Sequence, residues 1–221
     1  MRVVSINCGL PREVVWHGRS VTTSIYKEPV EGGIALRTLN LDGDRQSDLT
    51  VHGGKDKAVY CYPIEHYEHW RAELPGRALP MGAFGENFTT EGLASEDVVY
   101  VGDRFEVGGA AVVVTQPRLP CYKLGIRFGS DDMVKRFLEA GRTGFYLAVI
   151  REGEVRAGDE ITLLSRDPES VPVSAITRLY VAKRYDAEDA RQVRQALRVE
   201  ALPESWRAWF KEKLERLGGP E

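Results

Sequence analysis

Residues 97–115 read DVVYVGDRFEVGGAAVVVT and contain three short runs of β-branched and aromatic residues. These runs are Asp97–Tyr100, Arg104–Val107 and Ala110–Thr115, and glycines lie between them. Val, Tyr and Phe favour strands, whereas glycine and charged residues favour the turns that connect them. We therefore predict successive short β-strands in this part of the chain.

The same pattern extends outward over the first three-quarters of the sequence. Further strands are predicted at Val3–Ile6, Val21–Tyr26, Ile34–Leu41, Lys57–Tyr62, Phe145–Ile150 and Asp159–Leu164. So many short strands over this length predict a mainly β fold with a closed or partly closed barrel. Two peripheral helices should interrupt the strands: Pro63 suits a first helical position for a helix through Glu65–Ala72, and a second should run from a cap at Asp131 or Asp132 to Gly141.

The composition changes around residues 165–172, which resemble a linker. We therefore expect a β domain over residues 1–165 and a small helical domain over residues 166–221. Asp186 should cap one helix, and Pro203 should open the last one. The aromatic residues after Pro203, including Trp206, recur at helical spacing and are predicted to be core residues. A tail of this size needs to dock or to pack closely to be stable.

The overall composition is that of a soluble globular protein. The chain has 221 residues, 43% of them hydrophobic and 29% charged, with a formal net charge of −3. This charge gives no general attraction to nucleic acid polymers or anionic membranes, so an anion site would need local clusters of Lys and Arg. No apolar run is long enough to cross a bilayer and Met1–Leu10 lacks a signal-peptide layout, so a cytoplasmic protein is expected. The three cysteines are too few and too widely spaced for a disulfide framework, and Cys8 and Cys61 are expected to be structural.

The candidate site centres on residues 116–123, QPRLPCYK, directly after the predicted strand 110–115. Two prolines restrict the backbone on either side of Arg118, which lowers the entropy cost of ordering this loop. Arg118 and Lys123 place two cations near the Cys121 sulfur and would favour the thiolate, the form that attacks electrophiles and binds metals. The spacing alone is also compatible with an inert core cysteine beside two exposed basic residues.

Two other clusters could bind a ligand. In His52-Gly53-Gly54-Lys55, glycines leave backbone N–H groups accessible, and the positive charge favours phosphate or pyrophosphate. An ordinary β-turn is the alternative, and the GxxxxGK[ST] spacing is absent. Residues 84–88, FGENF, could present Asn87 to a ligand or simply finish a turn. His66 and His69 could share a metal, but no nearby carboxylate or Cys pattern completes a zinc site, and a solvated helix face is the favoured explanation.

In their order along the chain, these clusters resemble the MOSC family, named for the C-terminal domain of molybdenum cofactor sulfurase, and within it the stand-alone YiiM type. Residues 171–217 are similar to the three-helix domain appended in that type. The matching segments in residues 1–165 are Leu41-Asp42-Gly43-Asp44, Val51-His52-Gly53-Gly54, Tyr62-Pro63 with Glu65-His66-Tyr67, Phe84-Gly85-Glu86-Asn87, Val101-Gly102-Asp103, Gln116-Pro117-Arg118 and Pro120-Cys121-Tyr122-Lys123-Leu124.

The resemblance implies a β-barrel that binds a molybdopterin-type molybdenum cofactor. It places Cys121 at the family's metal-binding position and His52 in the pocket. We also expect His52 to be catalytic, as the proton donor, because the charge of imidazole changes near neutral pH. His66 fits the family pattern and His69 does not, so His66 is expected to pack in the fold. The cofactor-binding residues that we infer are Lys27, Arg45, His52, Gly53, Gly54, Lys55, Asn87, Arg118 and Lys123.

The resemblance also implies an activity: reduction of N-hydroxylated compounds, including N-hydroxylaminopurine base analogues, as a detoxifying oxidoreductase. No flavin, haem or iron–sulfur motif is found, so electrons should come from separate partner proteins. We expect no pyridoxal phosphate, nucleic acid polymer or membrane as partner, and either a monomer or a homodimer. Two alternatives stay open: a carrier of molybdenum cofactor or sulfur without substrate turnover, and a cofactor-free interaction barrel.

Overall fold

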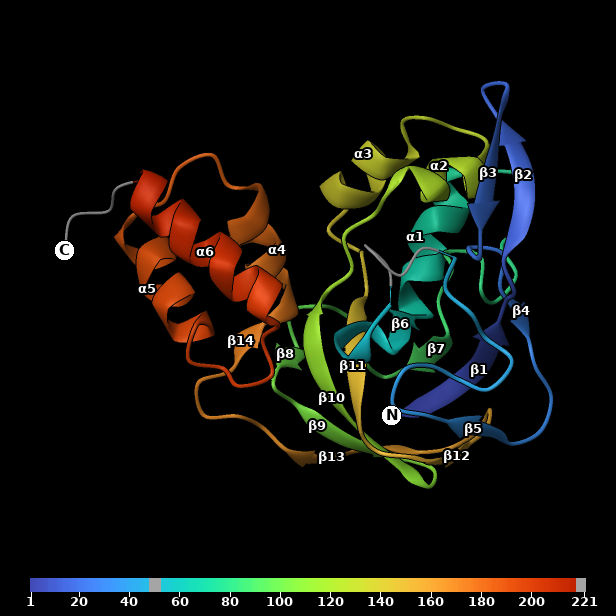
Figure 1. Ribbon diagram of the computed structural model, residues 1–221, viewed down its shortest axis with the longest axis horizontal. Helices are drawn as coiled ribbons and strands as arrows, with labels where there is room; N and C mark the ends of the chain where they lie inside the picture. Colours follow the sequence, from blue (N-terminus) through green and yellow to red (C-terminus); the bar gives the residue numbers. More distant parts are fainter. Residues whose placement is uncertain (48–52, 218–221) are drawn as a thin grey trace.

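The computed structural model describes residues 1–47 and 53–217. Within these ranges the largest element is a curved, mainly antiparallel sheet of eight strands (Figure 1). Its strands, in spatial order, are β13 (Ile161–Ser165), β9 (Arg104–Val107), β10 (Ala110–Pro117), β11 (Phe145–Arg151), β6 (Val59–Pro63), β7 (Phe88–Glu91), β1 (Arg2–Cys8) and β4 (Glu28–Pro29).

The two sides of this sheet approach each other at the start of β1. The backbone N–H of Val3 donates to the carbonyl of Asp159 at 2.9 Å, and that of Ile161 donates to Met1 at 2.8 Å. These bonds lie next to β13, at the other side of the sheet, but within the described residues no continuous ladder of paired strands closes a barrel. The prediction of a mainly β fold is confirmed.

Three separate strand pairs accompany this sheet, and several predicted strands are shorter than expected; the strand predicted at Val21–Tyr26, for example, ends at Thr23. The pairs are β2 (Arg12–Trp16) with β3 (Arg19–Thr23), β5 (Ile34–Leu36) with β12 (Gly153–Val155), and β8 (Tyr100–Val101) with β14 (Val171–Pro172). The strand predicted at Ile34–Leu41 ends at Leu36, because a turn follows in which the N–H of Arg37 donates to Asn40. The segment before Tyr100 is also a turn, and Val99 is buried without belonging to a strand.

Helices α1 (Glu65–Glu73), α2 (Tyr122–Phe128) and α3 (Met133–Glu139) enclose a second, aromatic core. Trp70 and Phe137 stack there with ring centroids 5.3 Å apart. Pro63 was predicted to open α1, but it ends β6 opposite Thr90, and the helix begins at Glu65. A proline fits this strand end because it has no N–H to donate. Helix α2 was not predicted.

Helices α4 (Val173–Val181), α5 (Ala187–Ala196) and α6 (Glu204–Leu217) gather at one end of the molecule, beside β8, β10 and β14 (Figure 1). Their apolar residues, including Trp206 and Phe210, continue the hydrophobic core of the sheet, as predicted for the aromatic stripe. The division at residue 165 stays a prediction. The longest described helix, α6, has 14 residues, and none of the described helices has the length and apolar character needed to cross a membrane.

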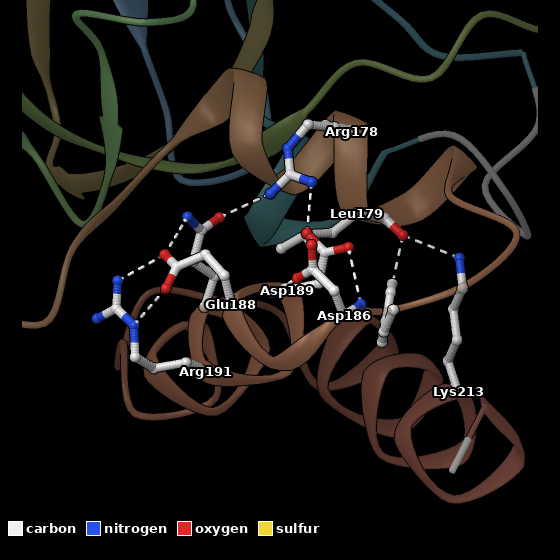
Figure 2. A network of polar contacts seen from close by, with 9 residues as sticks. Arg178, Leu179, Asp186, Glu188, Asp189, Arg191 and Lys213 are labelled. Atoms are coloured by element: carbon white, nitrogen blue, oxygen red, sulfur yellow. Dashed lines mark hydrogen bonds and ion pairs between the residues drawn. The ribbon is translucent and has the colours of Figure 1, made fainter. Parts of the chain in front are cut away.

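Polar contacts fix the three C-terminal helices to one another (Figure 2). Asp186 caps α5 as predicted, because its carboxylate accepts the N–H of Asp189 at 2.8 Å. The buried ammonium of Lys213 donates to the carbonyls of Leu179 and Tyr180 at 2.8 and 2.7 Å, at the C-terminal end of α4. A cation at this position satisfies carbonyls that have no partner within the helix.

Candidate functional site

A pocket lies where the β10–α2 loop meets the segment after β3 and the chain before residue 48. Its cavity volume is about 100 Å³, and it is partly open to solvent. Most of the predicted site residues line it: Lys27, Arg45, Gly53, Asn87, Arg118, Cys121 and Lys123.

Three predicted site residues are not placed in this pocket. His52 lies outside the described residues. Gly54 precedes the short 3-10 helix η1 (Lys55–Lys57) and has a positive φ of 82°, as expected for a turn glycine. Lys55 is exposed, forms an ion pair with Asp56 at 3.2 Å and lines a different hollow. Lys57, rather than Lys55, lines the pocket.

The β10–α2 loop is held by a chain of buried polar contacts. The N–H of Arg118 donates to the carbonyl of Gly144 at 3.0 Å, and the N–H of Gly144 donates to Oε1 of Glu96 at 2.6 Å. Nε2 of the fully buried His66 lies 3.0 Å from Oε2 of the same carboxylate. His66 therefore packs in the fold, as expected. Its contact with Glu96 helps to hold the loop that carries Arg118. The described residues contain no group of three or more His, Cys, Asp or Glu side chains that could hold a metal ion.

Arg118 is a buried cation with an unused donor. Its side chain lies against the rings of Tyr60 and Phe137, with its Cζ atom 5.2 Å from each ring centroid. Only 6% of the residue is exposed, and its Nη1 atom has no hydrogen-bond partner. A buried charged donor without a partner is costly unless a ligand supplies an acceptor. Arg118 is therefore suited to bind an anion in this pocket.

Asp44 organises the opposite wall of the pocket and was not among the predicted site residues. Its carboxylate accepts the N–H of Gly9 at 2.8 Å and Nδ2 of Asn87 at 2.9 Å, and it forms a buried ion pair with Lys27. Oδ1 of Asn87 in turn accepts the N–H of Tyr60 at 3.1 Å. These contacts hold Lys27 and Asn87 in place. Asp44 belongs to the Leu41–Asp44 turn that carried part of the family resemblance, and that turn was the available signal.

The pocket is basic despite this carboxylate. Lys123 is 7% exposed and its Nζ atom donates to Oγ of Ser47 at 2.9 Å. Burial lowers the pKa of Lys57, although the nearby Asp56 opposes this effect. Among the described residues that line the pocket, Asp44 is the one acidic residue. Five are basic: Lys27, Arg45, Lys57, Arg118 and Lys123.

The three cysteines have different environments. Cys121 is partly exposed, immediately precedes α2 and lines the pocket. Burial raises the pKa of Cys8 to about 11, with a further contribution from Asp44, and burial raises the pKa of Cys61 to about 12. Both thiols are protonated near neutral pH, which agrees with the structural role expected for them. Cys121 is the cysteine that combines access to solvent with a cationic pocket.

Family models match two regions of the chain: a MOSC domain over residues 48–162 and a YiiM-like 3-alpha helix domain over residues 171–217. The chain belongs to the MOSC domain family. It is 42% identical over 215 residues to the uncharacterized protein YflK of Bacillus subtilis (strain 168), covering 97% of this chain and 95% of YflK. The crystal structure of YiiM from Geobacillus stearothermophilus is similar with a TM-score of 0.79 and 35% identity, covering 96% of this chain and 98% of that one.

A third relative carries an activity in its name. A protein called "Reductase" from Gibberella moniliformis (strain M3125 / FGSC 7600) is 34% identical over 169 residues, which cover 75% of this chain and 30% of that protein. The MOSC match includes Cys121, Arg118 and Asn87. Lys27 and Asp44 precede it, so the wall that they form comes from outside the matched region.

Proposed function

We propose that this MOSC protein is a molybdenum-cofactor-dependent oxidoreductase that reduces N-hydroxylated compounds. The observation that carries the proposal is that the buried Arg118, whose Nη1 atom has no hydrogen-bond partner, lines the same basic pocket as the partly exposed Cys121. Membership of the MOSC family and the relative named as a reductase support it.

The residues present fit a molybdopterin-type group. Its phosphate requires cationic donors, which Arg118, Arg45 and Lys123 would supply. Its metal favours a soft sulfur ligand, which Cys121 would supply. Lys27 is paired with Asp44, so its main effect would be to hold the pocket wall rather than to neutralise the phosphate. When bound, the cofactor supplies two-electron redox chemistry at molybdenum.

The reaction converts an N-hydroxylated amine, R–NHOH, to R–NH2 and water. The N–O bond breaks, and the substrate takes up two electrons and two protons. The electrons would come from a separate reduced carrier protein with a flavin, haem or iron–sulfur centre. The protein's own part is to orient the N–OH group and to deliver protons to the departing oxygen.

Two residues are candidates for proton delivery. His52 is our prediction from the sequence, because imidazole changes charge near neutral pH. Tyr146 lines the pocket beside Cys121, and burial raises the pKa of its phenol although the charge of Arg118 opposes this. Tyr146 therefore carries its proton at neutral pH and could donate it.

The test uses protein made in a host that synthesises molybdenum cofactor. We expect molybdenum to copurify and N-hydroxylaminopurine to be reduced to the amine with an artificial electron donor. Cys121→Ala should lose the activity while keeping its fold, as judged by circular dichroism. His52→Gln with intact cofactor and an unchanged rate would remove His52 from the mechanism. Bound molybdenum without turnover would favour the carrier function instead, and absence of both molybdenum and turnover would overturn the proposal.

A further inference from the structure

A second hollow adjoins the first and meets it at Cys121. Its cavity volume is about 410 Å³, and it is also partly open to solvent. The two hollows share Lys57, Leu119, Cys121, Lys123 and Tyr146 in their linings. The remaining lining residues of the second hollow are Gln116, Pro117, Pro120, Tyr122, Ser205 and Trp206. Cys121 is thus accessible from two sides, and each side has its own chemical character.

The first hollow suits an anion, whereas the second suits a flat ring. Arg45 and the buried Arg118 line the first hollow and not the second. Besides the shared Tyr146, the second is lined by two further aromatic residues, Tyr122 and Trp206, together with two prolines. Aromatic and proline faces pack well against flat heterocycles, and a few polar groups at the edge fix their orientation.

The three-helix region forms one wall of this second hollow. Ser205 and Trp206 belong to the first turn of α6, and the opposite wall is the loop that carries Cys121. Trp206 is 7% exposed and is fixed by packing against Tyr180 and Phe210, whereas Tyr122 is 55% exposed. One wall is therefore rigid, and the other has a side chain that can adjust to a ligand.

We propose that the second hollow is the substrate site of this protein. It would hold a flat nitrogen heterocycle against Trp206 and Tyr122, with the N–OH group directed toward Cys121 and the cofactor in the first hollow. The proposal rests on the proposed function for the identity of the substrate. It gives the C-terminal helices a part in substrate selection, with Trp206 and Tyr122 as specificity-determining residues.

The test blocks the second hollow without opening the core. Ser205 is exposed at its rim, so Ser205→Trp should fill the hollow, and Lys211→Trp places the same ring on an exposed position of α6 outside either hollow. Equilibrium dialysis of the full-length proteins measures binding of N-hydroxylaminopurine. We expect wild type and Lys211→Trp to bind alike and Ser205→Trp to bind at least about tenfold more weakly. Molybdenum content should be equal in all three.

Tyr122→Ala gives an independent test at an exposed residue. It should weaken binding of the purine and raise the ratio of the KM for N-hydroxylaminopurine to the KM for hydroxylamine, which lacks a ring. Equal binding by wild type and Ser205→Trp would overturn the proposal, and so would loss of molybdenum in Ser205→Trp, because the hollow would then belong to the cofactor. A different result would overturn the proposed function alone: the wild type binds the purine at a site that Ser205→Trp blocks, but does not reduce it.

Discussion

The indole N–H of Trp206 donates a 2.6 Å hydrogen bond to Oε1 of Gln116. Gln116 lies near the end of β10, just before the loop with Arg118 and Cys121, and its own amide group donates to the carbonyl of Asp56 at 3.2 Å. One glutamine side chain therefore connects α6, the strand that presents the site loop, and η1. This hydrogen bond therefore joins α6 to the sheet close to Cys121.

Trp206→Phe should destabilise the protein by about 1–3 kcal/mol, because it leaves Oε1 of Gln116 buried without its donor. Adding Gln116→Leu should recover part of this loss, since the carbonyl of Asp56 still accepts from the hydroxyl of Thr115 at 2.7 Å. Urea denaturation of both single variants and the double variant gives the coupling energy. Simple additivity of the two losses would show that this hydrogen bond contributes nothing to stability.

Phosphate groups should stabilise the protein through Arg118. Pyrophosphate at 100 times its Kd should add about 2.7 kcal/mol to the free energy of unfolding, if it binds only the folded state. Arg118→Gln should abolish this increment, and Lys55→Gln should retain it, because Lys55 lies outside the pocket. Comparing thermal unfolding with and without pyrophosphate for each variant cancels any change in intrinsic stability. Equal increments in wild type and Arg118→Gln would exclude Arg118 as the anion-binding residue.

The sequence predicts those parts of the fold whose signals are local. The strand at Arg104–Val107 has the predicted bounds, because its alternation and the following Gly-Gly turn agree. Helix α2 escaped prediction, since Gly125 lowers helix propensity and Cys121 at the N-cap position is not among the residues that usually cap helices. Pro63 was misplaced because a proline suits both a strand end and a first helical turn.

The candidate site also contains some residues that local sequence patterns predict and others that they do not. Arg118, Cys121 and Lys123 could be found because they lie within one short stretch of sequence. Asp44 reaches Asn87 and Lys27 only through tertiary packing, and no local pattern reveals that contact. The aromatic spacing of α6 predicted Trp206 as a core residue, which its burial confirms. That spacing could not show that the same residue also lines a hollow beside Cys121.

Alkylation should separate the three cysteines. At pH 8 iodoacetamide should modify Cys121 in the folded protein, while Cys8 and Cys61 react slowly because burial raises their pKa values to about 11 and about 12. Peptide mass spectrometry after timed quenching measures each site, and protein unfolded in urea provides the control in which all three react. Faster modification of Cys61 than of Cys121 would contradict the structure.

The raised pKa of Cys8 also predicts a pH dependence of stability. The folded state holds the thiol proton more tightly than the unfolded state, whose thiol has a pKa near 9. The contribution of Cys8 is therefore fully present below pH 9 and is lost as the pH rises toward 11. Cys8→Ser should lose less stability than wild type between pH 8 and pH 10.5 in urea denaturation. Parallel curves for the two proteins would remove this linkage.

Tyr146→Phe tests proton delivery at the point where the two hollows meet. The variant keeps the ring but removes the phenol, so kcat for N-hydroxylaminopurine should fall by about 100-fold, the lower end of the range for general acid catalysis, with a smaller change in KM. Tyr180→Phe on α4 is the matched control, since it lines neither hollow. Molybdenum content should be unchanged in both variants, so that the lower kcat reflects the chemical step.

The wild-type rate should also show a pH dependence set by Tyr146. Because burial raises the pKa of its phenol, the rate should not fall through loss of this proton below about pH 10, the ordinary pKa of tyrosine. A Tyr146→Phe enzyme as fast as Tyr180→Phe, combined with a large loss in His52→Gln, would assign the proton to the histidine.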